Sequence, residues 1–332
     1  MNKQPLVSFI IIAYNQEKYI EEAIRGAFAQ TYEPLEIILS DDNSPDKTFE
    51  IMQRLAEEYD GPHKVVLNRN EPNLGIGGHT NRVMELSQGE FIVVNAGDDI
   101  SFPNRVRDTV NKWVDCGQID CVISAQSIQI GENGNVLSIE PYESRSSLES
   151  LSSVENLATE NGWLLGASLA FTKSLHDFFG PINKNVVAED VILALRGAIL
   201  GEILLLDAPL VYYRQVGIIS GNKNSNSTNI WMRFITMTAF NNIQRLVDVE
   251  KARSEKLISS ELSNLLNDTF NVDINRYKLC ESIILGKSGK FKYLSLTITK
   301  LSGVKICKDI FRSIIVRFSK YRVTFQKMVR QR

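Results

Sequence analysis

The feature that most limits the possible folds of this chain is an uninterrupted apolar run close to its start. Residues 6–13 read Leu-Val-Ser-Phe-Ile-Ile-Ile-Ala, and only Ser8 among them is polar. A strand that is apolar on both faces is typical of the centre of a parallel sheet with helices on both sides. Because parallel strands need crossover connections, helical segments should separate the strands along the chain.

The first 220 residues follow this alternation. Apolar residues recur at helical spacing from Glu17 to Phe28, with acidic residues near the start of that segment. Period and turn residues predict strands over 35–40, 64–67, 91–95, 121–130, 167–172, 202–206 and 210–214. They predict helices over 45–59, with Ser44 as N-cap, and over 80–87, 103–114 and 189–200, with a loop over 73–78. We therefore expect an α/β fold with a doubly wound, mostly parallel sheet and flanking helices.

Two of the predicted strands end in paired carboxylates, Asp41-Asp42 and Asp98-Asp99. The carboxyl ends of parallel strands meet at the edge of the sheet where α/β proteins bind ligands. Adjacent carboxylates in a cleft need a cation or strong donors, and a divalent metal that carries a phosphate supplies both. The alternative is that Asp99 only caps the helix that Pro103 begins.

Other chemical signals are weaker. A third pair, Glu189-Asp190, stands at a helix start, where capping alone would also explain it. The three histidines show no pairing that would predict zinc or a catalytic triad. Gly75-Ile76-Gly77-Gly78 lacks the dinucleotide-binding spacing, and no Gly-Lys-Ser/Thr phosphate loop exists.

Charge divides the chain unevenly. Residues 287–332 hold 13 Lys and Arg against one acid, a net charge of +12, while residues 1–286 carry −14. Apolar residues recur there at helical spacing among Lys and Arg: Ile306, Ile310, Phe311, Ile314, Ile315 and Phe318. Such a basic amphipathic helix favours an anionic membrane surface. The alternatives are a helix packed on the acidic body and, less favoured, nucleic-acid binding.

The cysteines and the hydropathy indicate a compartment. Cys116, Cys121, Cys280 and Cys307 lack metal-ligand spacing and lie in apolar segments, which favours free thiols and a reducing environment. No run of about 18 apolar residues and no signal peptide is present. We expect a cytoplasmic protein that is neither exported nor membrane-spanning.

Several short motifs follow one another in order over residues 6–220. They are the opening Ile-Ile-Ala-Tyr-Asn, Gln30-Thr31-Tyr32, Glu36, Asp41 to Asp46, Thr48, Asn73-Leu74-Gly75, Asn81, Gly89-Glu90, Asp98-Asp99, Glu189-Asp190 and Tyr213-Arg214. As an ordered set they resemble the inverting family-two glycosyltransferases of the GT-A fold, of the type that builds bacterial surface polysaccharides. The resemblance implies a UDP- or dTDP-sugar donor, and a hydroxyl of a lipid-linked saccharide as acceptor at the inner face of the cytoplasmic membrane.

The resemblance also implies roles for single residues. Asp99 would hold Mg²⁺ or Mn²⁺, and Asp190 would be the general base, with Glu189 as the second candidate. The implied nucleotide-sugar-binding residues are Ala13, Tyr14, Asn15, Asp41, Asn73, Asp98 and Arg214. Among these, Asp41 would read the uracil or thymine edge, Asp98 would lie near the ribose, and Arg214 would reach the diphosphate. The alternative for Arg214 is a solvated charge at a strand end.

Two departures from the family pattern keep rival functions open. Ala96 stands where many relatives carry an acid, and Ala13 where a hydroxyl residue is common. One rival is an inactive nucleotide-sugar-binding module. A sugar nucleotidyltransferase is the other, although it should carry a basic, glycine-rich loop where this chain has Ala13 to Gln16. We expect a glycosyltransferase domain over 1–220, a helical extension over 221–286 and a basic segment over 287–332.

Overall fold

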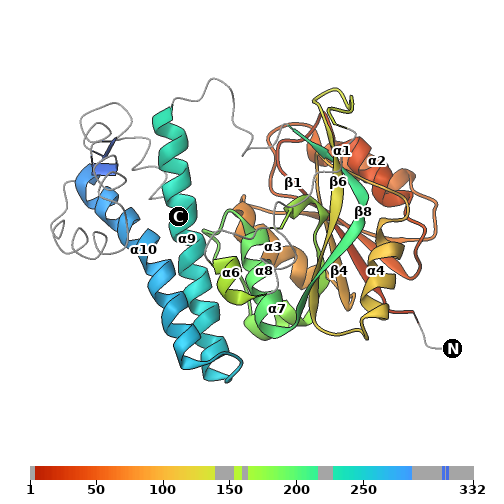
Figure 1. The fold of residues 1–332 in the computed structure, drawn as a ribbon. Helices are drawn as coiled ribbons and strands as arrows, with labels where there is room; N and C mark the ends of the chain where they lie inside the picture. The colour runs from red at the N-terminus through yellow and green to blue at the C-terminus, as the bar shows by residue number, and fades with distance from the viewer. Residues whose placement is uncertain are drawn as a thin grey trace. The chain divides into compact units, whose positions relative to one another are not determined.

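The apolar run at the start of the chain forms β1 (Val7–Ala13), which lies inside a mixed sheet (Figure 1). The computed structural model describes residues 4–138, 153–158, 164–215, 227–285, 309–310 and 312–313. Within them the strand order is β3-β2-β1-β4-β7-β6-β8-β5. The other strands are β2 (Leu35–Asp41), β3 (Lys64–Arg69), β4 (Phe91–Ala96), β5 (Ile100–Ser101), β6 (Cys121–Ile130), β7 (Ala170–Thr172) and β8 (Glu202–Arg214).

Most strand pairs are parallel, as the sequence predicted. β1 pairs in parallel with β2 and β4, β2 with β3, and β6 with β8. β7 runs antiparallel to β4 and β6, and the short β5 runs antiparallel to β8. The helices between these strands are α1 (Ile20–Phe28), α2 (Thr48–Glu58), α3 (Gly75–Leu86), α4 (Arg105–Asp115), α6 (Val154–Ala158), α7 (Ser174–Phe179) and α8 (Glu189–Leu200), with a 3-10 turn at η1 (Gly166–Ser168).

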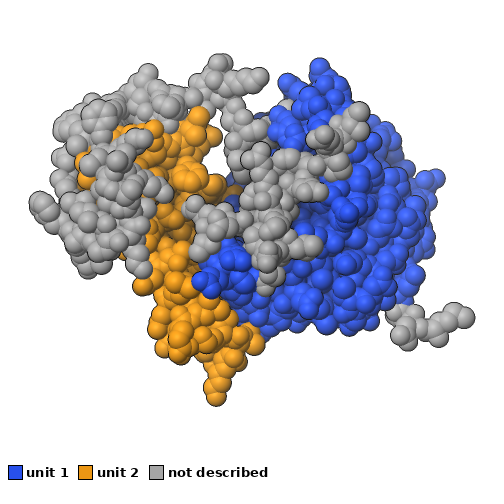
Figure 2. Space-filling model, viewed as in Figure 1, with its two compact units in different colours: residues 1–184, 188–220 blue, residues 185–187, 221–332 orange. Residues whose placement is uncertain are grey.

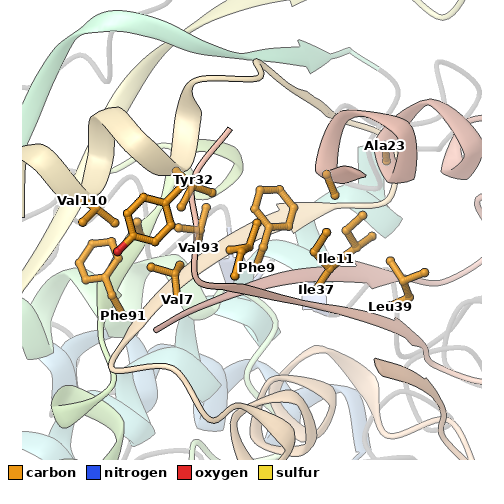
Figure 3. Packing of buried hydrophobic residues seen from close by; sticks show 14 of the residues in the cluster. Val7, Phe9, Ile11, Ala23, Tyr32, Ile37, Leu39, Phe91, Val93 and Val110 are labelled. Carbon is orange, nitrogen blue, oxygen red and sulfur yellow. The ribbon is translucent and has the colours of Figure 1, made fainter. Parts of the chain in front are cut away.

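Successive residues of β1 serve opposite faces of the sheet, as the period of two requires. Phe9 and Ile11 belong to a buried cluster with residues of α1, α2 and α4, part of which is drawn in Figure 3. Ile10 belongs to a second buried cluster with residues of α3, α7 and α8. Helices therefore cover both faces of the sheet, which explains why the run had to be apolar throughout.

Hydrogen bonds to acidic side chains that follow β2 or end it account for two errors in the predicted elements. The expected loop over 73–78 contains the first turn of α3, because the Asp42 carboxylate accepts the backbone N–H groups of Leu74 and Gly75 at 2.8 and 2.9 Å. Ser44 is not the cap of the next helix. Its side chain donates to Asp41, and α2 begins at Thr48, whose N–H donates to Asp46 at 3.0 Å.

The predicted strands over 202–206 and 210–214 are one strand, β8. Its pairing with β6 continues across an irregularity near Gln126, so the break in the apolar pattern does not end the strand. The predicted strand over 167–172 is shorter, since residues 166–168 form η1 before β7 begins. The Ser-rich composition of residues 144–153 predicts a polar loop, and all of this segment but Ser153 lies outside the described residues.

The chain divides into two compact units, residues 1–184 with 188–220 and residues 185–187 with 221–332 (Figure 2). The second unit contains α9 (Ser227–Ser254) and α10 (Ser260–Leu285). Trp231, Ile235 and Ala239 of α9 form a buried cluster with Tyr277 and Cys280 of α10. No described helix is both long and apolar enough to cross a bilayer. The predicted basic helix beyond residue 305 lies outside the described residues, except for 309–310 and 312–313.

Candidate active site

Two acidic pairs meet at one edge of the sheet, as the strand pattern predicted. Ala13 at the end of β1 pairs with Asp41 of β2, and Ile12 pairs with Ala96 of β4. The Gly97 N–H donates to the Ile12 carbonyl at 2.9 Å, which continues this contact past the end of β4. The Asp41-Asp42 and Asp98-Asp99 pairs therefore lie at the carboxyl edge, at the ends of the two strands that flank β1.

The turn that carries Asp98 and Asp99 is tightly packed. A Cβ atom added to Gly97 would lie 2.8 Å from the Ala13 Cβ, so the backbone approaches β1 at a distance that only glycine permits. Asp99 is 1% exposed, and its Oδ1 accepts the backbone N–H of Arg214 at 2.8 Å. Because α4 begins at Arg105 and the Asp99 carboxylate contacts β8, the helix-cap alternative for Asp99 is wrong.

Burial makes this pair of carboxylates electrostatically costly. Desolvation raises the pKa of Asp98, and desolvation together with the charge of Asp98 raises the pKa of Asp99 well above its usual value. Arg105 lies nearby and is buried, which lowers its pKa to about 9. Its guanidinium donates to Asn95 Oδ1 at 3.0 Å and to the Val94 carbonyl at 2.7 Å. A cation bound here would stabilise the charged form of both carboxylates and so lower their pKa values.

The donor set suits a divalent ion that is only partly held by protein. Among the described residues no group of three or more His, Cys, Asp and Glu side chains could enclose a metal. Mg²⁺ usually takes one or two carboxylates and completes its coordination with phosphate oxygens and water. The Asp98-Asp99 pair fits that pattern, and one oxygen of Asp99 already accepts a backbone hydrogen bond.

The end of β2 is held by its own polar contacts. Asp41 is fully buried; its Oδ2 accepts the Ser44 N–H at 2.9 Å and lies 3.5 Å from Arg69 Nε. Asn73 donates to the Asp42 carbonyl at 2.7 Å and accepts the Gly75 N–H at 3.0 Å. In this structure Asn73 therefore fixes the connection into α3. That Asp41 and Asn73 bind the nucleotide-sugar stays a prediction.

The connection after β1 is joined to the connection after β2. The Asn15 N–H donates to Ser44 Oγ at 2.8 Å, and the Gln16 N–H donates to Thr48 Oγ1 at 2.8 Å. Asn15 adopts a left-handed conformation with φ of 60°, which asparagine tolerates better than most residues. Ala13 is buried, whereas the Tyr14 side chain is 44% exposed. Of these three predicted binding residues, Tyr14 and Asn15 are exposed and can reach a ligand.

The third acidic pair begins α8, as predicted. A Cβ atom on Gly166 would lie 3.1 Å from Asp190 Oδ2, so this glycine leaves room for the Asp190 carboxylate. The Leu169 carbonyl, just beyond η1, accepts the Val94 N–H of β4 at 3.1 Å, which places η1 beside the carboxyl half of β4. Asp190 therefore approaches the same edge of the sheet from a different element.

Glu189 occupies apolar surroundings. It lines a small cavity with Ile10, Ile12, Val83, Met84, Val94 and Leu193, among others. Desolvation, with a further contribution from Asp190, raises the pKa of Glu189 to about 7. A carboxyl group with a pKa near neutrality is a recurring property of general bases.

Sequence reasoning missed the environment of Arg214. This residue is 2% exposed, and its guanidinium donates to backbone carbonyls and to Glu22. The solvated-charge alternative is wrong. No local signal could have revealed these contacts, because Glu22 stands 192 residues earlier in the chain.

Comparison with known proteins agrees with this geometry. The family model described as Glycosyl transferase family 2 matches residues 8–164. An uncharacterized glycosyltransferase of Methanocaldococcus jannaschii is 32% identical over 136 residues, which cover 40% of this chain and 46% of the relative. The chondroitin synthase of Escherichia coli is 32% identical over 138 residues, 42% of this chain and 19% of the synthase. The chain thus spans less than half the length of either relative.

Solved structures resemble the fold at low sequence identity. S. aureus TarS 1-349 in complex with UDP-GlcNAc has a TM-score of 0.56 at 16% identity, covering 98% of this chain and 91% of that chain. The mannosyltransferase PcManGT from Pyrobaculum calidifontis, in complex with GDP-Man and Mn²⁺, has a TM-score of 0.53 at 16% identity, covering 99% and 85%.

The parallel-dominated sheet with flanking helices and the resemblance to these structures show a GT-A-like fold. Residues 8–164 of this chain match the glycosyltransferase family 2 model, as the motifs predicted.

Proposed function

We propose that this protein transfers a sugar from a UDP- or dTDP-sugar to a hydroxyl group of a saccharide acceptor, with inversion at the anomeric carbon. The observation that carries the proposal is the buried Asp98-Asp99 turn beside the end of β1, with Asp41 at the end of β2 on the other side of β1. The TarS complex with UDP-GlcNAc supports a uridine donor. The PcManGT complex with Mn²⁺ supports a divalent ion.

The residues divide the work by position. Asp99, assisted by Asp98, would hold Mg²⁺ or Mn²⁺, which when bound offsets the charge that develops on the departing diphosphate. Asp41 and the exposed Tyr14 side chain would face the nucleoside. Asp190 would remove the proton from the acceptor hydroxyl as its oxygen attacks the anomeric carbon, opposite the leaving diphosphate. A single displacement of this kind inverts the anomeric centre.

An inactive donor-binding module is the second candidate, because Ala96 stands where family members often carry an acid. Release of UDP from a UDP-sugar in the presence of acceptor separates the two. Turnover that requires acceptor excludes the module, whereas donor binding without turnover on any acceptor of a saccharide panel favours it.

Asp99→Asn should weaken binding of UDP in the presence of Mn²⁺ by about tenfold or more, because an amide cannot neutralise the ion. The fold should persist, since the Asn Oδ1 can still accept the Arg214 N–H that Asp99 accepts now. Calorimetric titration with UDP, with and without Mn²⁺, measures the effect.

The matched control for Asp99→Asn is Asp177→Asn, a substitution of an exposed acid on α7. The control should bind as the parent protein does. If Asp99→Asn binds UDP and Mn²⁺ as tightly as the parent protein does, Asp99 is not a metal ligand.

We further propose that the acceptor is lipid-linked, that the product contributes to a surface polysaccharide, and that residues 287–332 bring the enzyme to the inner face of the cytoplasmic membrane. The net charge of +12 on this segment supports the membrane proposal. Each basic residue close to an anionic surface contributes about 1 kcal/mol to the free energy of binding, so four such residues suffice to hold the protein there. Salt should weaken this binding.

Glutamine at Lys287, Lys290, Lys292 and Lys300 should reduce sedimentation with anionic vesicles while leaving transfer to a soluble acceptor intact. Neutral vesicles serve as the control. Equal sedimentation of parent and variant with anionic vesicles would contradict the membrane proposal.

A further inference from the structure

Arg214, the last residue of β8, makes contacts in several directions from a buried position. Its Nε donates to the Asp98 carbonyl at 2.9 Å. One terminal nitrogen donates to the carbonyls of Gly131 and Glu132 at 3.2 and 3.0 Å, and the other donates to the Glu22 carboxylate. Its backbone N–H donates to Asp99 Oδ1. The guanidinium therefore binds protein acceptors on both sides.

These contacts join β8 to three other segments of the first unit. Glu22 belongs to α1, Asp98 to the turn after β4, and Gly131 to the hairpin after β6. The Tyr19 ring lies 4.8 Å from the guanidinium carbon, and its hydroxyl donates to Glu132 at 3.2 Å. The Asp98-Asp99 turn is thus held against α1 and the hairpin through Arg214.

We propose that Arg214 is a positioning residue that fixes the Asp98-Asp99 turn, and that it does not bind the diphosphate. The inference rests on the proposed function, since that function makes this turn the donor site. A planar guanidinium can donate to several acceptors at fixed angles, whereas a lysine ammonium is a single point charge on a flexible stem. The geometry of the side chain, and not its charge alone, is what the turn requires.

Arg214→Lys separates these roles because it keeps the charge and loses the planar fork. Amide hydrogen exchange over residues 95–101, measured without ligand, should become about tenfold faster or more. Affinity for UDP with Mn²⁺ should fall about tenfold, as for other substitutions behind a metal ligand. The Glu22 side chain is 54% exposed, so Glu22→Gln should have a smaller effect. It should also speed amide exchange over 95–101 and weaken UDP binding, each by a smaller factor than Arg214→Lys does.

The control is Arg25→Gln, which removes an arginine from the exposed face of the same helix, where it pairs with Glu21 at 2.7 Å. It should leave turn exchange and UDP affinity at parental values. A diphosphate ligand would behave differently: Arg214→Lys would lower UDP affinity without changing exchange in the turn, and Glu22→Gln would change neither. That outcome overturns the inference.

The exchange measurement also distinguishes this failure from failure of the proposed function. A parent protein that binds no UDP with Mn²⁺ contradicts the proposed function, while exchange in the turn still decides whether Arg214 positions it. Should Arg214→Lys not fold, Glu22→Gln decides: faster exchange over 95–101 supports positioning, and parental exchange overturns it.

Discussion

Asp190→Asn should lower the rate of sugar transfer by about two orders of magnitude or more while leaving the affinity for the donor near the parental value. General-base catalysis typically contributes ~10²–10⁴-fold, and the amide of asparagine cannot accept the acceptor proton. Donor affinity should persist because Asp190 lies in the first turn of α8, beside Gly166, and belongs to a different element from the Asp98-Asp99 turn. Steady-state release of UDP measures transfer, and titration with UDP and Mn²⁺ measures donor binding.

Glu189→Gln is the matched comparison, because Glu189 is the other carboxylate of the pair. If Asp190 is the base, the loss in Asp190→Asn should exceed the loss in Glu189→Gln by about tenfold or more. If Glu189 is the base, the order reverses. In that case the parental rate should rise with pH through about 7, where this carboxyl loses its proton.

The raised pKa of Glu189 also predicts how the stability of Glu189→Gln depends on pH, and measuring that stability shows whether the variant is folded. The pKa of Glu189 is about 7 in the folded protein against 4.5 for the free side chain, so the folded state is penalised when the group ionises. The penalty is absent at pH 4 and fully present above pH 7. Glu189→Gln should therefore be more stable than the parent at pH 8, by on the order of 1–3 kcal/mol, and equally stable at pH 4.

Period and strand-end chemistry predicted much of the fold and the place of the acidic turn. The strand over 121–130 and the helix over 189–200 occur at the predicted residues, because their apolar patterns are local and complete. The start of α3 could not be predicted, since Asp42 supplies the acceptor for it from more than 30 residues away. Ser44 is a residue type that often caps helices, but its hydroxyl donates to Asp41 and accepts the N–H of Asn15, 29 residues away in the chain, at 2.8 Å.

The candidate site shows the same division. The sequence placed Asp98 and Asp99 at the end of a buried strand, since an apolar run followed by two acids is a local pattern. It could not predict that Arg214 joins the turn to Gly131 and Glu22, because those pairs are 83 and 192 residues apart. It also could not predict that the Asn73 side chain would donate a hydrogen bond to the backbone carbonyl of Asp42.

The basic segment over 287–332 shows how one acid can decide where part of a segment packs. Its single acidic residue, Asp309, is 2% exposed. The carboxylate accepts Arg276 Nη2 of α10 and Trp231 Nε1 of α9, each at 3.1 Å. The Arg312 guanidinium carbon lies 5.9 Å from the centre of the Trp231 ring. The described part of this segment therefore packs on α9 and α10, the two helices of its own unit. The packed-helix alternative placed the segment on the acidic body without naming these helices.

Asp309→Ala should lower the free energy of unfolding of this helical unit by about 3–5 kcal/mol, because it leaves the buried Arg276 without its closest carboxylate. Amide hydrogen exchange over residues 227–285 of the full chain, read against exchange in β1 and β4, localises the loss to the second unit. Asp309→Asn should lose less, since its Oδ1 can still accept from Trp231 and Arg276. Glu255→Ala, at an exposed acid in the turn between α9 and α10, is the control and should exchange as the parent does.

Parental protection of α9 and α10 in Asp309→Ala would mean that the ion pair does not anchor the segment. Loss of that protection would show that Asp309 anchors it, and would require tests of membrane binding to use charge substitutions that spare residues 309–313, since truncation would also destabilise the unit.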